Sequence, residues 1–182
     1  MFVEKWMTPD PQTIPPDATI SAVALEMNRR KFRHFPVAEP TPSGMRLVGI
    51  VAKYDIARGF PNDLNPFSLE VTEDSVPRPV SAVMTKKVIT TTPDCPIEEA
   101  ARLLRSNRIG ALPVLKENRL IGIITESDLF DAFISMTAAK SGGVRIFIES
   151  DFDDSPLPAV LELCRKYRVR SEERRVGKEC RL

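Results

Sequence analysis

The chain has 182 residues, of which 42% are hydrophobic and 28% are charged. This composition suits one globular domain, or two small domains that share a core, and it excludes wholesale disorder. A formal net charge of +1 argues against a nucleic-acid-binding protein. No uncharged apolar run reaches the roughly 18 residues of a membrane span, and the N-terminus MFVEKWMTPD does not have the pattern of a signal peptide.

The reactive side chains of the sequence do not predict catalysis. Cys95, Cys164 and Cys180 are widely separated, which predicts neither a disulfide framework nor a zinc site and favours a reduced, cytoplasmic setting. His34 is the single histidine, so neither a histidine-based triad nor a multi-histidine metal site is expected. A glycine-rich phosphate loop is also missing from the sequence. We therefore expect no catalytic residues and no metal, and classify the chain as not an enzyme.

An internal repeat determines the predicted architecture. Three dipeptides recur 77 positions later and one four-residue block recurs 73 positions later: Met7-Thr8 and Met84-Thr85, Pro16-Asp17 and Pro93-Asp94, Pro36-Val37 and Pro113-Val114, and Leu47–Ile50 and Leu120–Ile123. The change in spacing falls in a proline-rich turn of the first copy, as expected because loops absorb insertions that packed elements do not.

Both copies predict the same order of elements along the chain, strand, helix, strand, strand and helix. The first copy predicts an extended piece at Gln12–Ile14, an amphipathic helix, strands at His34–Ala38 and Leu47–Val51, and a helix that begins at Lys53. The second copy predicts an extended piece at Val88–Thr91, a helix that includes Ile97, Ala100, Ala101 and Leu104, strands at Ala111–Leu115 and Leu120–Ile124, and a helix from Glu126. Copies of about 55 residues are too small to be stable alone, so we expect the two to pack together. The proline-rich stretch Gly59–Pro79 is expected to wrap the outside of the core.

This pattern of Met-Thr, Pro-Asp, Pro-Val and a later Gly and Asp resembles the CBS domain, and its two copies resemble a CBS pair, or Bateman module. The resemblance covers residues 6–133 and implies an α/β (α+β) fold of two β-α-β-β-α repeats related by pseudo-two-fold symmetry. We expect the first repeat at 1–58, a linker at 59–80 and the second repeat at 81–140.

The C-terminal part has a different character after Ser141. Val144–Glu149 alternates like a strand and Leu157–Tyr167 predicts a helix. This order resembles the start of an ACT domain, which implies the layout of acetoin-utilisation-type CBS proteins with a partial ACT-like segment at 141–169. The alternative is a simple extension that packs on the CBS helices. Residues 170–182 resemble the translation of an adapter sequence, and we expect a non-native tail there; the alternative is a natural charged tail.

The segment from Gly122 to Asp128 carries the strongest chemical signal. A strand that ends at Thr125 opens a helix, and the free N–H groups of a helix N-terminus attract phosphate. The Thr125 hydroxyl suits a phosphate oxygen and the Asp128 carboxylate suits the two hydroxyls of a ribose, which are the roles that the resemblance implies for them. The alternative is a capping box, in which Asp128 reaches back to a helix capped by Thr125.

The resemblance implies that each cleft lies between the repeats and takes residues from both. Arg33 and His34 then face the Asp128 cleft, where they suit phosphates; the alternative for this basic cluster is a solvated helix end. The base needs an apolar slot and backbone partners. Candidates for the slot, each of which alternatively belongs to the core, are Ile14, Ile123 and Phe35, and candidates for the backbone contacts are Thr13 and Ile14.

A weaker second cleft is expected around Asp55, with Ile50 and Thr91. The first copy has Ala52 where the second has Thr125, and the residues opposite Asp55 are Gly110 and Ala111, which carry no side-chain donor. We therefore expect one competent site in each chain.

These observations predict a regulatory module that senses an adenosine-containing ligand, namely AMP, ADP, ATP or S-adenosylmethionine, and biases a partner or attached domain. No tightly bound cofactor, nucleic acid or membrane is expected, and the output partner is left open. The alternative is a ligand-free dimerisation scaffold, and a third hypothesis is a regulatory fragment of an enzyme. A homodimer is expected through apolar helix faces that include Ala22, Leu25, Met27, Leu129, Phe130 and Phe133.

Overall fold

The structure is a computed structural model that describes residues 1–68, 70–136 and 157–167 of the chain. It divides into two units, Met1–Lys140 and Ser141–Leu182. The first unit holds both copies of the sequence repeat, which we name repeat 1 and repeat 2. In the described part of the second unit lies the helix α5 (Leu157–Lys166).

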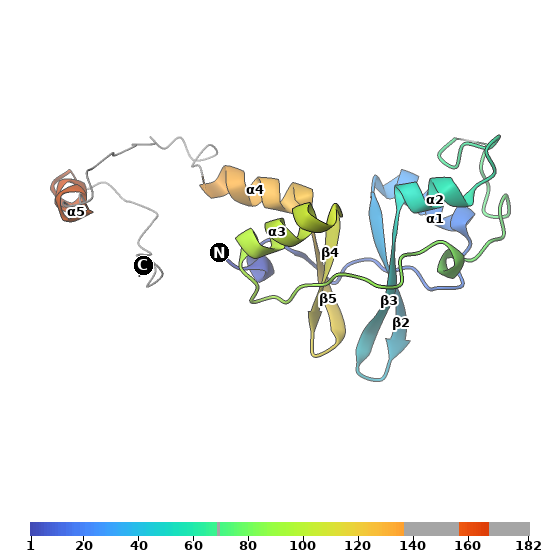
Figure 1. Cartoon of the computed structure of the whole chain (residues 1–182), viewed down its shortest axis with the longest axis horizontal. Helices are drawn as coiled ribbons and strands as arrows, with labels where there is room; N and C mark the ends of the chain where they lie inside the picture. Colours follow the sequence, from blue (N-terminus) through green and yellow to red (C-terminus); the bar gives the residue numbers. More distant parts are fainter. Residues whose placement is uncertain (69, 137–156, 168–182) are drawn as a thin grey trace. The chain divides into compact units, whose positions relative to one another are not determined.

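Repeat 1 is a two-stranded antiparallel sheet with two helices beside it (Figure 1). Its elements in chain order are α1 (Ile20–Arg30), β2 (His34–Thr41), β3 (Gly44–Ala52) and α2 (Lys53–Gly59). The hydroxyl of Thr19 caps α1 by accepting the N–H of Ala22 at 3.2 Å, and Lys31 ends the helix in a left-handed conformation.

Repeat 2 contains the same elements with one added strand. They are α3 (Ile97–Asn107), β4 (Ala111–Lys116), β5 (Arg119–Thr125) and α4 (Glu126–Met136). The short strand β1 (Thr8–Pro9) joins this sheet in the order β1-β5-β4, although it precedes repeat 1 in the sequence.

The register of the strands shows that the two repeats are equivalent. Val37 pairs with Gly49 and Val114 pairs with Gly122, and the hairpin of each repeat shifts register directly after that pair. The extended pieces before the helices form parallel bridges at equivalent places, Ile14 to Val37 and Thr91 to Val114. The predicted order of elements is therefore confirmed in both copies.

The repeats exchange the segments that precede their first helices. Val3, in the short 3-10 helix η1 (Val3–Lys5), is wholly buried in the core of repeat 2, and Val80, in η2 (Val80–Ala82), is wholly buried in the core of repeat 1. The N–H of Ile97 donates to the Met1 carbonyl at 2.9 Å, and the N–H of Ile20 donates to the Arg78 carbonyl at 2.8 Å. Each core thus depends on a segment that lies next to the other repeat in the sequence.

Two glycines make room for this exchange. Met7 lies over Gly122 in β5, and Met84 lies over Gly49 in β3, so that a Cβ atom at either glycine would collide with the methionine sulfur. The repeated Met and Gly of the sequence therefore contact each other. Each contact joins the segment before one repeat to a strand of the other repeat.

The stretch 59–79 does not lie outside the core, so that expectation is wrong. Val71 and Phe60 are 4% and 5% exposed in the core of repeat 1, and Leu64, Phe67 and Val76 pack against it. The hydroxyl of Ser21 on α1 accepts the N–H of Val76 at 2.7 Å. The physical reason is size, because a short sheet and two helices bury too little apolar surface by themselves.

The remaining expectations for helices have mixed outcomes. Met27, expected on a free apolar face, is wholly buried in the core of repeat 1, so that part of the prediction is wrong. The predicted C-terminal helix is confirmed as α5. Val144–Glu149 and residues 170–182 lie outside the described residues, and the ACT-like segment stays a prediction.

The exchanged segments generate a test of the fold. Replacing Val3 with Ala removes two buried methyl groups, and we expect the free energy of unfolding to fall by about 1–3 kcal/mol. Hydrogen exchange should accelerate in β4 and β5 of repeat 2, although Val3 precedes repeat 1. Lys5→Ala, an exposed change in the same helix, is the control. Faster exchange confined to β2 and β3 would contradict the exchange of segments.

Candidate functional site

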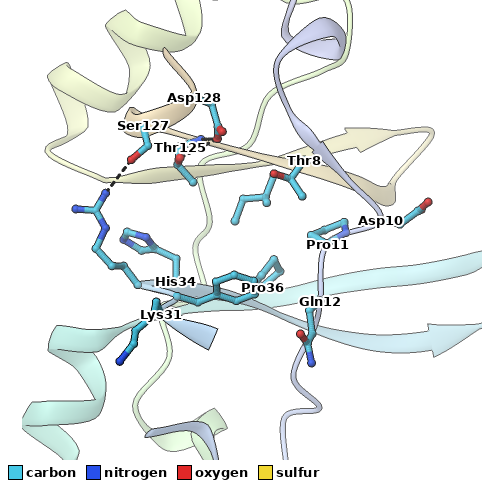
Figure 2. A pocket seen from close by; sticks show the side chains of 13 residues that line it. Thr8, Asp10, Pro11, Gln12, Lys31, His34, Pro36, Thr125, Ser127 and Asp128 are labelled. Atoms are coloured by element: carbon cyan, nitrogen blue, oxygen red, sulfur yellow. Dashed lines mark hydrogen bonds between the residues drawn. The ribbon is translucent and has the colours of Figure 1, made fainter. Parts of the chain in front are cut away.

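A cavity of about 450 Å³ lies between the two repeats (Figure 2). Three parts of the chain line it: the crossing segment after β1, the turn from α1 into β2, and the junction of β5 with α4. The lining residues are Thr8, Asp10, Pro11, Gln12, Lys31, Phe32, Arg33, His34, Pro36, Ile123, Thr125, Ser127 and Asp128. We name this space the inter-repeat cavity, and it brings together five of the predicted site residues from both repeats.

Asp128 and Thr125 form a helix cap at the wall of the inter-repeat cavity. The Oδ2 atom of Asp128 accepts two hydrogen bonds of 2.7 Å, one from the Thr125 N–H and one from the Thr125 hydroxyl. The capping arrangement expected as the alternative is therefore present. The other carboxylate oxygen of Asp128 takes no part in this cap. The Thr125 hydroxyl must release Asp128 before it donates to a ligand.

Repeat 1 has the same cap without the hydroxyl. The Ala52 N–H donates to Oδ2 of Asp55 at 2.8 Å, which matches the backbone half of the cap in repeat 2. Asp55 lines a smaller cavity of about 180 Å³ together with Arg58 and Arg78. Ile50 and Thr91, the other residues predicted for the second cleft, do not line that cavity.

Those two residues are placed by backbone pairing. Ile50 exchanges backbone hydrogen bonds with Thr85, and Thr91 pairs with Val114. Thr91 is 6% exposed, and its buried hydroxyl has no hydrogen-bond partner. Of the three residues predicted for the second cleft, Asp55 is therefore the one that lines this smaller cavity.

The cations of the inter-repeat cavity gather at one end of it. Arg33 Nη2 donates to the Ser127 hydroxyl at 3.4 Å, which links the start of β2 to α4 (Figure 2). Figure 2 shows Lys31 and His34 toward this end, whereas Asp10 and Gln12 lie at the opposite end. The cations therefore lie on the side of repeat 1, whereas Asp10 lies at the far end and Asp128 lies on the side of repeat 2.

His34 is a half-buried base in this wall. Burial lowers its pKa from the usual 6.5, and the charge of Arg33 lowers it further, while Glu126 and Asp55 oppose these effects. The ring lies against Gly110, where a Cβ atom would come within 2.8 Å of its Cε1. Gly110 supplies no side-chain donor, as expected. Because it has no Cβ atom, it leaves the space that the imidazole of His34 occupies.

The apolar slot has other members than expected. Phe35 is wholly buried in the core of repeat 1, and Ile14 is 7% exposed there. The N–H of Ile14 donates to the Pro36 carbonyl and its carbonyl accepts the Ala38 N–H, so both backbone groups are used in pairing. Of the three predicted members only Ile123 lines the cavity, and Phe32 and Pro36 add to its apolar lining. Phe32 packs edge-on against Phe35, with ring centroids 5.4 Å apart.

Several lining residues were missed by sequence reasoning. Ser127 lies between the predicted site residues Thr125 and Asp128, so its position at the start of the helix could have predicted that it lines the cavity. Lys31 was not among the predicted site residues, and its left-handed conformation, with φ of 60°, turns the chain into β2 beside the cavity. Thr13, predicted for a backbone contact, follows the lining residue Gln12 but does not itself line the cavity.

The described residues limit the kinds of site that this part of the chain can hold. They contain no group of three or more His, Cys, Asp or Glu side chains arranged to hold a metal ion. No helix in this part of the chain is long and apolar enough to cross a bilayer.

Comparison with known families gives a match to the CBS domain at residues 3–62 and again at 80–135. A CBS domain-containing protein from Dictyostelium discoideum is 31% identical over 141 residues, which cover 75% of this chain and 93% of that protein. A homoserine O-acetyltransferase from Methanohalobium evestigatum is 33% identical over 129 residues, which cover 70% of this chain and 23% of the enzyme. The chain thus spans less than a quarter of that enzyme.

Solved structures show the same fold. An acetoin utilization protein (AcuB) from Vibrio cholerae has a TM-score of 0.63 at 26% identity, covering 80% of this chain and 98% of that one. CBSX2 in complex with AMP has a TM-score of 0.61 at 24% identity, covering 75% and 98%. The CBS domain pair of protein MJ0100, in complex with 5′-methylthioadenosine and S-adenosyl-L-methionine, has a TM-score of 0.61 at 23% identity, covering 75% and 98%.

The environment of His34 predicts how stability depends on pH. Because the pKa of His34 is lower in the folded chain than the usual 6.5, the unfolded chain takes up the proton first as the pH falls. This contribution to the free energy of unfolding is complete above about pH 6.5 and is lost as the pH falls through the folded-state pKa. Urea unfolding between pH 5 and 8 should show wild type losing stability relative to His34→Gln at the acid end. A relative gain there would show that the pKa of His34 is raised instead.

Proposed function

Because the chain belongs to the CBS domain family, we propose that this CBS pair is a regulatory module whose inter-repeat cavity binds an adenosine-containing ligand. One observation carries the proposal: a single cavity of about 450 Å³ joins Asp128, at the start of α4, to the cations of repeat 1. This volume lies in the usual range of small-molecule sites. AMP, ADP, ATP and S-adenosylmethionine are the ligands to be compared.

Each part of such a ligand has chemically suitable partners in the cavity. The carboxylate oxygen of Asp128 that is free of the cap suits a ribose hydroxyl, because a charged acceptor forms a strong hydrogen bond. Phe32, Pro36 and Ile123 offer apolar contact to the base. AMP in CBSX2 and S-adenosyl-L-methionine in the MJ0100 pair support the choice of an adenosine ligand.

We further propose that the occupied cavity biases a partner or attached domain. Both repeats line the cavity, so a bound ligand changes the free energy of their contact. The match to only 23% of an acetyltransferase agrees with a module that is attached to different proteins. No catalytic residue of this chain takes part in the proposal.

A groove between α3 and α4 supports self-association as the second part of the function. The groove of about 480 Å³ includes Leu129, Phe130 and Phe133 in its lining. Phe130 and Phe133 are 66% and 57% exposed, which is unusual for large apolar side chains on one helix face. We assign a second copy of this chain to the groove, as the resemblance to CBS pairs predicts.

The ligand proposal is tested by two equivalent substitutions. Both Asp128→Ala and Asp55→Ala remove the carboxylate from a helix cap, so both should lose about 0.5–2 kcal/mol of stability. Only Asp128→Ala should also weaken nucleotide binding, by roughly tenfold to a hundredfold, since a charge-assisted hydrogen bond contributes about 1.5–3 kcal/mol.

Calorimetry with the four ligands measures this difference. If Asp55→Ala is the damaging change, the assignment of the cavity is wrong. If none of the four ligands binds wild type or raises its melting temperature, the scaffold hypothesis replaces the sensor.

Self-association has its own test. The double change Phe130→Glu and Phe133→Glu places charge in the groove and should convert a dimer into a monomer at tens of micromolar in sedimentation velocity. Phe2→Glu, at another exposed phenylalanine, is the control. A wild type that sediments as a monomer would refute the dimer.

A further inference from the structure

His34 is placed where one proton affects the contact between the repeats. It begins β2 of repeat 1, it lies against Gly110 of repeat 2, and it lines the inter-repeat cavity. It is also the only histidine of the chain. An imidazole is the side chain whose charge changes near neutral pH. At this position, proton binding by His34 is therefore coupled to the binding of a charged ligand in the cavity.

Charged groups from several elements lie around this ring or line the same cavity. Arg33 precedes it in the chain, Glu126 lies on α4, and Asp55 lies on α2. Lys31, at the end of α1, and Asp128, on α4, line the same cavity. Asp10 belongs to the opposite end, as Figure 2 shows. This end of the cavity therefore has Lys31, Arg33 and the half-buried imidazole on the side of repeat 1, and the carboxylate of Asp128 on the side of repeat 2.

The protein groups around His34 favour the neutral imidazole. Burial and the charge of Arg33 lower the pKa of His34 more than Glu126 and Asp55 raise it. The Arg33 guanidinium donates to a neutral hydroxyl, that of Ser127, at 3.4 Å, and no ion pair to Arg33 is among those found in the described residues. An anion placed at this end meets Lys31 and Arg33 and offsets the effect of the Arg33 charge on His34.

We propose that the inter-repeat cavity selects adenosine ligands whose 5′ position carries a phosphate, and that His34 takes up a proton when such a ligand binds. This inference rests on the proposed function, because the ribose must be held near Asp128 for the 5′ group to reach Lys31, Arg33 and His34. A sulfonium at the same place meets the like charges of Lys31 and Arg33, and a neutral thioether leaves the charge there unchanged. Selection therefore follows from the charge of the 5′ group rather than from the base.

Linkage gives the sign of the pH dependence. A ligand that raises the pKa of His34 must bind more tightly as the pH falls toward that pKa, by up to about tenfold for each pH unit by which the ligand displaces the titration. AMP should show this effect and 5′-methylthioadenosine should not. The phosphate of AMP itself titrates near pH 6, so the variant lacking the imidazole is needed as a reference.

The experiment compares AMP with 5′-methylthioadenosine by titration calorimetry from pH 5.5 to 8, each in two buffers of different ionisation enthalpy. Wild type should take up a fraction of a proton with AMP, beyond that taken up by His34→Gln, and none with 5′-methylthioadenosine. Lys31→Gln is the matched control, because it should weaken AMP binding at every pH and keep the proton uptake. Binding of S-adenosylmethionine more tightly than AMP would overturn the selection.

A second measurement does not depend on any variant folding. The single imidazole gives one Cε1 proton resonance, whose titration is followed in free wild type and with AMP, 5′-methylthioadenosine or inorganic phosphate. AMP should move the midpoint to higher pH. An unchanged midpoint in AMP-saturated protein would refute the proton uptake while leaving the adenosine site intact. Absence of adenosine binding with a midpoint moved by phosphate would refute the proposed function and leave an anion-linked histidine.

Discussion

Val3 is buried in the core of repeat 2 although repeat 1 follows it in the sequence, and Val80 is buried in the core of repeat 1 although repeat 2 follows it. This exchange constrains the rest of the molecule. After η1 the chain must leave repeat 2 and cross to repeat 1 before α1 begins. The crossing starts as β1, which pairs with β5 through Thr8 and Ile123. Because the crossing segment is held by both repeats, it forms a fixed wall beside which the inter-repeat cavity opens.

Two repeats with the same backbone nevertheless line the inter-repeat cavity differently, because repeat 2 contributes a carboxylate and repeat 1 contributes cations. The helix that begins after Ala52 and the helix that begins after Thr125 each have a carboxylate cap of the same kind, so the backbone of the two sites is alike. The side chains around them differ, since Thr125 adds a hydroxyl and Arg33 corresponds to Gly110 in the other repeat. Gly110 also provides the space that His34 occupies. The asymmetry of charge therefore arises from a few substitutions on a symmetric backbone.

Helix capping and ligand binding are not exclusive at Asp128. One carboxylate oxygen accepts from Thr125 and holds the start of α4 in place, while the other remains for a ligand. A residue that is already positioned by a cap loses little side-chain entropy on binding, which favours affinity. The Arg33 contact with Ser127 similarly holds a cation near the site before any ligand arrives, because a single hydrogen bond to a neutral hydroxyl is weaker than one to a phosphate.

The sequence by itself determined the repeat, the order of its elements and the residues Arg33, His34, Ile123, Thr125 and Asp128 of the cavity. The repeat and its elements follow from local pattern, because periodicity, turn residues and helix starts are encoded within a few neighbouring positions. The grouping of the five cavity residues follows from the resemblance to CBS pairs, which implies a cleft between the repeats. Only the tertiary structure decided which core received Val3 and Val80, why Val71 is buried, and that Phe32 rather than Phe35 faces the cavity. It also decided that Ser127 meets Arg33. The physical reason is that burial and pairing depend on residues far apart in the sequence, such as Ser21 and Val76, 55 positions apart, and Arg33 and Ser127, 94 positions apart. The pattern of neighbouring residues does not specify such contacts.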